Sequence, residues 1–241
     1  MTYCVAMRLQ QGMIFAADSR TNAGVDHIAT FRKLHRFEVP GERLIVLLSA
    51  GNLATTQSVI SLLRERWDEP EKTSLKSIAT LYDGAALLGE TLREIISRDG
   101  GQTQTGVDFG GSFLLGGQLR GESCRLFHVY AEGNFIESTE DTPYFQIGES
   151  KYGKPIIDRV VDYRLTLDQA MKCALISIDS TIRSNLSVGM PLDVMLYQQD
   201  SFDSSQHYSI DENHAYYREL REAWSDGLRE TFRCLPALRL G

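Results

Sequence analysis

The fold is decided at the start of the chain by residues 1–24, which have the sequence MTYCVAMRLQQGMIFAADSRTNAG. Residues 2–9 and 13–17 are two runs rich in apolar residues, and Gln10, Gln11 and Gly12 form a turn between them. This pattern predicts a β-hairpin. Because the turn lies midway, strand pairing brings Asp18 back beside the start of the chain. Residues 18–24 are expected to form a polar loop.

The pattern outside this hairpin alternates blocks of strands and blocks of helices. Strands are expected over residues 33–39, 43–49, 110–119, 124–131, 134–138, 144–148, 191–198 and 206–210, the four from 110 to 148 forming an antiparallel meander. Helices are expected from Asn52, from Lys76, twice after residue 150 and over residues 213–232, with a capping box at Thr166 and Gln169. Segregated strands and helices favour an α+β fold, in which two antiparallel sheets lie between helix layers. There is no internal repeat or linker, so one domain is expected over residues 1–241.

Composition excludes several classes of function. The formal net charge is -7, with 25 Lys and Arg against 32 Asp and Glu and no basic cluster, so neither nucleic acid nor a membrane surface is an expected partner. No apolar run approaches the ~20 residues of a membrane helix, and we expect no signal peptide at the N-terminus. The four cysteines are widely spaced. Four could pair, but free thiols in a reducing cytoplasm are the expectation.

Thr2 is the first candidate for chemistry. Threonine is small enough to permit removal of the preceding Met1, which leaves a hydroxyl and a free α-amine on one residue. Such an amine can act as the general base for its own hydroxyl. Its unperturbed pKa is about 7.7–8.0, so part of it is neutral near pH 7. Many chains begin Met-Thr without any such role, so further residues have to support this one.

Three residues provide that support. The predicted hairpin places Asp18 beside Thr2, and Lys33 opens the strand that follows the polar loop. A lysine near the nucleophile would favour the neutral amine and stabilise a developing oxyanion, while a carboxylate would hold the lysine charged and in place. Gly51 lies where a strand passes into a helix, so its backbone N–H suits an oxyanion hole. The alternatives are an ordinary Asp–Lys surface pair and an ordinary helix entry.

Other catalytic signatures are missing from the sequence. HExxH, GxSxG and GxxxxGK[ST] do not occur, and the five histidines are isolated. No cysteine lies at zinc-ligand spacing, so neither a metal nor a cofactor is expected. The glycines at 110–111 and 116–117 flank strands and do not open a helix, which favours turns and close packing over a phosphate site.

At this point the chain resembles the proteasome β subunits, and most closely the bacterial ancestral beta subunit (Anbu) group. Thr2, residues 17–20 with Gly24 beyond, Lys33 and residues 49–51 match in order and spacing, and residues 147–153 and 183–189 favour the Anbu group. The resemblance covers roughly residues 2–200. It implies a four-layer αββα sandwich of the N-terminal-nucleophile hydrolase type, with residues 205–241 as a C-terminal strand–helix extension. It also implies assembly of identical subunits into a ring or stacked rings.

The resemblance also implies roles for individual residues. Thr2 would be the nucleophile and base, Asp18 and Lys33 would orient and activate it, and Gly51 would supply the oxyanion N–H. Residues that would contact an extended peptide or line the pocket before the scissile bond are Arg20, Thr21, Asn22, Ser49 and Leu53.

Two motifs depart from the family pattern. Residues 148–150 are Gly-Glu-Ser where the family usually has Gly-Ser-Gly, and Ser184 stands where it usually has the aspartate of Arg-Asp. Ser187 matches the family serine. Ser150, together with Ser184 or Asn185, would replace the lost carboxylate by hydrogen bonding. We therefore expect reduced peptidase strength with an unchanged nucleophile.

The leading hypothesis is a threonine-type peptidase or amidase that acts on a peptide or protein and assembles from identical subunits. One alternative is a non-catalytic scaffold of the same fold, although a scaffold does not need an Asp–Lys pair near Thr2. Another is an amidase for small molecules. A Cys4 nucleophile would require further trimming of the chain. An unfoldase or adaptor partner is an open question at this stage.

Overall fold

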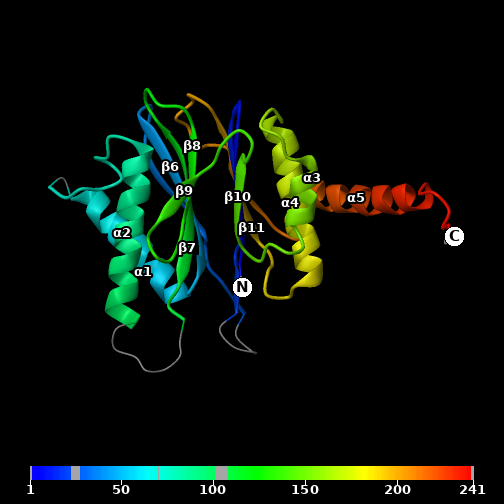
Figure 1. The fold of residues 1–241 in the computed structure, drawn as a ribbon, viewed down its shortest axis with the longest axis horizontal. Coiled ribbons are helices and arrows are strands. Elements are labelled where there is room, and N and C mark those ends of the chain that lie inside the picture. The colour runs from blue at the N-terminus through cyan, green and yellow to red at the C-terminus, as the bar shows by residue number, and fades with distance from the viewer. Residues whose placement is uncertain (1, 23–27, 70, 101–107, 240–241) are drawn as a thin grey trace.

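The computed structural model describes residues 2–22, 28–69, 71–100 and 108–239. Figure 1 shows four layers, in which two sheets lie face to face between two pairs of helices. The α+β sandwich expected from the sequence is confirmed. Among the described residues, no helix has the length and apolarity needed to cross a membrane.

The first sheet contains the N-terminal hairpin at its centre. Its strand order is β10-β1-β2-β11-β12, and all neighbours are antiparallel. The strands are β1 (Tyr3–Leu9), β2 (Gly12–Asp18), β10 (Tyr144–Gly148), β11 (Leu192–Gln198) and β12 (His207–Ile210). Nearly every residue of β1 and β2 is buried, because a helix layer covers one face of this sheet and the second sheet covers the other.

The second sheet has the order β5-β6-β7-β8-β9 and is a continuous antiparallel meander. Its strands are β5 (Leu34–Val39), β6 (Arg43–Gly51), β7 (Gly111–Leu119), β8 (Arg125–Val129) and β9 (Phe135–Glu137). The prediction of a four-strand meander over residues 110–148 is wrong in its last strand, since β10 crosses to pair with β1 in the first sheet. Strand pairing between distant segments leaves no local signal in the sequence.

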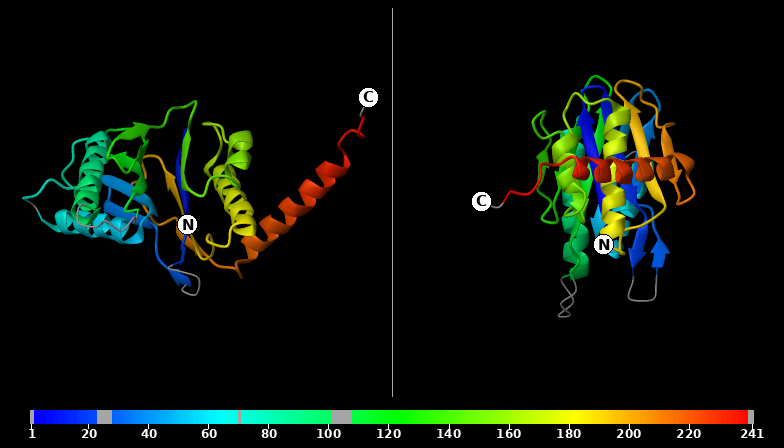
Figure 2. Two further views of the ribbon diagram at one scale, coloured as in Figure 1. Left: turned by 60° about the horizontal axis from the view of Figure 1, so that its bottom comes forward. Right: turned by 90° about the vertical axis from the view of Figure 1, so that its right-hand side faces the viewer.

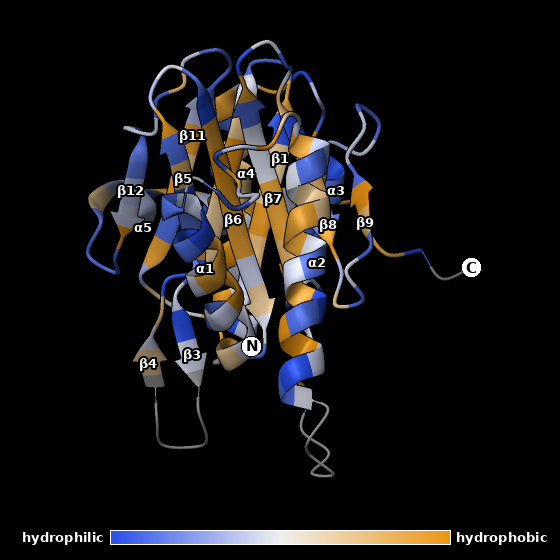
Figure 3. Cartoon of the chain, turned by 90° about the vertical axis from the view of Figure 1, so that its left-hand side faces the viewer, coloured by the Kyte–Doolittle hydropathy of each residue, from blue (hydrophilic) through white to orange (hydrophobic). Residues whose placement is uncertain are grey.

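The polar loop predicted over residues 18–24 is also only partly right. Residues Arg20–Asn22 form β3, which pairs with Ile28–Thr30 (β4) in a separate two-stranded sheet. Figure 3 shows this ribbon projecting from one end of the sandwich. Three polar residues carry no alternation that would distinguish a strand from a loop.

Two helices cover each outer face. Helices α1 (Leu53–Asp68) and α2 (Leu81–Gly100) pack on the second sheet, and α3 (Lys154–Val160) and α4 (Leu167–Ser184) pack on the first. The capping box is confirmed, with the Thr166 hydroxyl accepting from the backbone N–H of Gln169. In Figure 3 the strands behind α1 and α2 are mainly hydrophobic, while the loops at the sheet ends are hydrophilic.

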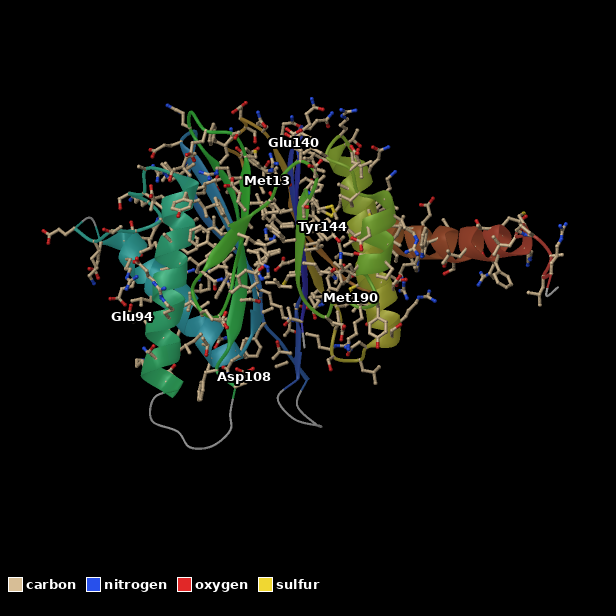
Figure 4. All side chains as sticks on the ribbon, viewed as in Figure 1. Met13, Glu94, Asp108, Glu140, Tyr144 and Met190 are labelled. Carbon is tan, nitrogen blue, oxygen red and sulfur yellow. The ribbon has the colours of Figure 1, made fainter. Side chains whose placement is uncertain are left out.

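The core is divided into three clusters, one under each helix pair and one between the sheets. Met13 belongs to the central cluster, and Figure 4 shows it between the two sheets. A Cβ on Gly116 would lie 2.7 Å from the Met13 side chain, so close packing accounts for that glycine, as the sequence indicated. All four cysteines are free.

The last helix, α5 (Ala215–Arg233), extends away from the sandwich (Figures 1 and 2). Only Tyr217 of this helix is fully buried, where the helix starts against α4. Leu220 also packs against the core and Arg221 pairs with Asp179 of α4, and the C-terminal part of the helix projects beyond all four layers.

Candidate active site

The N-terminal hairpin brings Thr2 and Asp18 together, as predicted. Cys4 pairs with Ala17 across the two strands, and the backbone N–H of Tyr3 donates to Asp18 Oδ1 at 2.9 Å. The Asp18 carboxylate therefore contacts the backbone of Tyr3, the residue next to Thr2. The geometry follows from the length of the turn at residues 10–12.

Asp18 and Lys33 form a buried ion pair. Lys33 Nζ lies 2.6 Å from Asp18 Oδ1, and the two side chains are 6% and 0% exposed. Lys33 Nζ also donates to the carbonyl oxygen of Arg20 at 2.8 Å, and the N–H of Gly189 donates to Asp18 Oδ2 at 3.2 Å. Burial raises the pKa of Asp18 above its ordinary value, against the opposing effects of Lys33 and the two backbone donors. The alternative of a surface pair is thus excluded by the burial.

Gly148 fixes the backbone of Thr2 from the other side. Gly148 has φ +86°, and a Cβ built there would lie 2.0 Å from the carbonyl oxygen of Thr2. The next residue, Glu149, donates its backbone N–H to that same carbonyl at 2.7 Å. Only glycine allows this approach, because any side chain would displace Thr2 or the strand.

Thr2 lies on the wall of a cavity of about 480 Å³. The other lining residues come from the start of β3, the start of β5, the end of β6, the first turns of α1 and the end of β10: Thr21, Arg32, Lys33, His35, Ser49, Ala50, Gly51, Leu53, Thr56, Gln57 and Gly148. The structure thus brings together Thr2, Lys33 and Gly51, the three residues that the sequence selected for nucleophile, activation and oxyanion contact.

Gly51 ends β6 and lies directly before the helix. It has φ +110°, and a Cβ there would lie 2.5 Å from the carbonyl oxygen of Gly110. Asn52 is the N-cap of α1, accepting from the backbone N–H of Thr55 through its side chain. The conformation therefore requires glycine, and it turns the chain sharply at the cavity edge.

The predicted substrate-binding residues divide into two groups. Thr21, Ser49 and Leu53 line the cavity. Arg20 instead points its guanidinium toward the turn before β11, where Nη1 donates to the carbonyl of Leu186 at 3.1 Å. Asn22 ends β3, so its backbone belongs to the projecting ribbon. Gly24, part of the same motif, lies outside the described residues.

The predicted support residues do not line this cavity. Ser150 lies along a second cavity, which it shares with Tyr144 and Lys154. Ser184 is the exposed last residue of α4. The N–H of Ser187 donates to Asn185 Oδ1 at 2.9 Å, within the turn that follows α4. Their roles in catalysis stay predictions.

Sequence reasoning missed Glu149. The residue is 9% exposed, its Oε2 accepts from Asn185 Nδ2 at 3.0 Å, and its backbone N–H donates to the carbonyl of Thr2. A buried carboxylate at position 149 thus bonds to the turn that follows Ser184 through Asn185. The signal that could have found it is the glutamate at position 149, where the family usually has a serine.

The pKa values of His35 and Cys4, two groups near the site, are strongly shifted. Burial, assisted by Arg64 and Arg32, lowers the pKa of His35 to about 4, so this imidazole is neutral at pH 7. Burial raises the pKa of the Cys4 thiol. A protonated, fully buried thiol is a poor nucleophile, which argues against the Cys4 alternative. Within the described part of the chain, no cluster of three or more His, Cys, Asp or Glu could hold a metal.

Comparison with known proteins gives a consistent result. The family model described as "Proteasome subunit" matches residues 2–195. The chain is 63% identical to Anbu (ancestral beta-subunit) from Yersinia bercovieri, covering 99% of this chain and 100% of that one with a TM-score of 0.95. It is 52% identical to the Pseudomonas aeruginosa protein solved as the helical assembly of the Anbu complex, covering 99% and 98% with a TM-score of 0.95. It is also 25% identical over 218 residues to proteasome subunit beta of Haloquadratum walsbyi, covering 88% of this chain and 79% of the relative.

Proposed function

Because the chain belongs to the proteasome subunit family, with the Anbu proteins as its structural neighbours, we propose that it is a threonine-type N-terminal-nucleophile peptidase or amidase. One observation carries the proposal. A single cavity contains Thr2, Gly51 and Lys33, and the ammonium of Lys33 is held at 2.6 Å by a fully buried carboxylate. A purely structural subunit has no need to bury a charge pair beside its second residue, because burying ions costs free energy.

The chemistry begins once Met1 is removed. The free α-amine of Thr2 takes the proton from Thr2 Oγ as the oxygen attacks the carbonyl carbon of a peptide or amide. The ammonium of Lys33 favours the neutral amine by repulsion, and Asp18 keeps Lys33 in place. The N–H of Gly51 stabilises the oxyanion, the amine returns the proton to the leaving nitrogen, and the C–N bond breaks. Water then hydrolyses the ester on Thr2 by the same route.

The supporting shell is altered, so we propose weak turnover. Glu149 stands in place of the usual serine, and its backbone N–H donates to the Thr2 carbonyl at 2.7 Å, while Asn185, next to Ser184, donates to the Glu149 side chain at 3.0 Å. Ser150, Ser184 and Ser187 remain candidates for positioning the amine. A covalent labelling assay is therefore the appropriate test, since it needs one attack rather than many turnovers.

The test uses purified protein whose intact mass shows an N-terminal Thr2. We expect an electrophilic peptide epoxyketone or β-lactone to add one equivalent, and peptide mapping to place it on Thr2. Thr2→Ala should abolish the adduct, and Thr2→Ser should retain it. Protein that starts at Thr2 yet never labels, or a Thr2→Ala variant that labels equally, would refute the proposal.

We also propose that the chain assembles with identical subunits through the extension at residues 205–241, joined to an otherwise single domain. The P. aeruginosa relative is described as a helical assembly. In this chain α5 and the segment that follows it expose apolar side chains, with Leu228, Phe232 and Leu235 at 50%, 75% and 57% exposure. Figure 4 shows the side chains of α5 standing clear of the sandwich. A row of apolar side chains on a projecting helix is typical of an interface.

Light scattering over a concentration series tests the assembly. We expect Leu228→Ser with Phe232→Ser to lower the mass, and Ile136→Ser, an equally apolar change on exposed β9, to leave it unchanged. A monomeric wild type would refute assembly. An unchanged mass in the double variant would place the interface elsewhere. The geometry of the assembly, ring or otherwise, stays a prediction.

A further inference from the structure

The cavity beside Thr2 has an unbalanced charge. Among its described lining residues, Arg32 and Lys33 are cationic and none is Asp or Glu. The charge of Lys33 is neutralised from behind by Asp18. Arg32 is exposed and forms no ion pair with any described residue. The guanidinium of Arg32 is therefore available to an anion that enters the cavity.

The remaining lining combines polar groups with apolar surface. Thr21, Ser49, Thr56 and Gln57 contribute hydroxyl and amide groups, and Leu53 is the one large apolar side chain among the described lining residues. A pocket built for a leucine or phenylalanine side chain would be mainly apolar. The hydroxyl and amide groups lie beside apolar surface, so a side chain with a short aliphatic stem and a polar end matches this lining.

The pKa of His35 reflects the positive charges near the cavity. Arg64 on α1 and Arg32 both act on this imidazole and, together with burial, disfavour its protonation. A neutral imidazole can still donate one hydrogen bond to a carboxylate. The cavity lining thus includes a guanidinium and an uncharged donor, and Asp18, the carboxylate behind the lining, is already paired with Lys33.

We propose that the cavity selects an acidic side chain, glutamate or aspartate, on the acyl side of the bond that Thr2 attacks, with Arg32 as the residue that determines the preference. The inference rests on the proposed hydrolase function. Arg32 and His35 line the same cavity as Thr2, so a side chain that enters the cavity while its carbonyl is at Thr2 can meet them. A carboxylate there completes a charge-assisted hydrogen bond.

The test compares two fluorogenic peptide amides that differ only in Glu or Gln before the scissile bond. These side chains have nearly the same shape, so the ratio of kcat/KM measures the charge alone. We expect a preference of about tenfold for Glu, because Arg32 is exposed and solvent weakens the pair. The preference should vanish in Arg32→Gln, and Arg32→Glu should favour the Gln peptide over the Glu peptide. Arg164→Gln, at an exposed arginine between α3 and α4, should leave the ratio unchanged.

A second readout separates this inference from the proposed function. NMR of the His35 imidazole is followed while N-acetyl-glutamate amide or N-acetyl-glutamine amide is added. A saturable shift with the glutamate compound alone supports an anion-selective pocket even if no peptide is hydrolysed and Thr2 never labels. Equal turnover of Glu and Gln peptides, an unchanged preference in Arg32→Gln, or, where turnover is absent, no glutamate-selective shift would overturn the inference, whatever the labelling of Thr2 shows.

Discussion

Removing Lys33 should destabilise the fold as well as the site. In Lys33→Met the aliphatic stem is preserved, but Asp18, which is 0% exposed, loses a charge partner at 2.6 Å. Breaking a buried pair in this way typically costs about 3–5 kcal/mol. Asp18 keeps two backbone donors, Tyr3 and Gly189, so we expect the lower end, about 3 kcal/mol at pH 7.

The sign of the pH dependence follows from the same geometry. Without Lys33, burial raises the folded-state pKa of Asp18 further above its unfolded value. The native state then binds a proton that the unfolded state releases, so stability is lost as pH rises through the folded pKa. We therefore expect the deficit of Lys33→Met relative to wild type to be smaller at pH 4.5 than at pH 7.

Urea unfolding at one fixed protein concentration measures both effects, since assembly makes stability depend on concentration. The control is Lys72→Met, which breaks an exposed pair with Glu69 at 2.7 Å and should cost far less, because solvent already screens that pair. Two results would refute the argument that Lys33→Met leaves the buried Asp18 charge without a partner. One is an equal loss of unfolding free energy in the two variants, and the other is a loss in Lys33→Met that does not change with pH.

Three further outcomes follow from individual residues. Gly148→Ala should abolish covalent labelling and destabilise the protein by more than about 2 kcal/mol. Gly121→Ala has a similar φ of +90° but open space around the added Cβ, so it should cost about 1 kcal/mol from backbone strain alone. Similar costs for the two variants in urea unfolding would contradict the steric argument. A histidine whose pKa is lowered in the folded state stabilises the fold above its unfolded pKa and loses that contribution as pH falls. His35→Gln should therefore lessen the loss of stability between pH 6.5 and 4, by at most about 3 kcal/mol. An unchanged pH profile would contradict this. Thr166→Ala should lower stability by about 1 kcal/mol through loss of the N-cap, seen as a shift of the urea midpoint at constant slope.

The local parts of the fold were predictable because their signals lie within a few residues. The turn at residues 10–12 determines which residue of β2 returns to the chain start, and Thr166 with Gln169 marks the first turn of α4. Partnerships between distant segments were not. The pairing of β10 with β1 joins residues more than 130 positions apart, and the ribbon of β3 and β4 contains too few residues to show a period.

The site divides in the same way. Thr2, Asp18, Lys33 and Gly51 could be selected from order, spacing and chemistry alone; the structure places Thr2, Lys33 and Gly51 around one cavity, with Asp18 paired to Lys33 behind it. The roles of those residues, and of Ser150, Ser184 and Ser187, still rest on the proposals above.

The sequence by itself determined that the first hairpin would carry Asp18 to Thr2, because turn length and strand period fix which residues meet. Only the tertiary structure decided that Glu149 holds Thr2, and that Arg32 and His35 face the same cavity from β5 and the residues before it. Burial and electrostatic potential depend on every element packed around a group. The burial of a side chain and the potential around it are therefore set only when the sheets and helices have packed together.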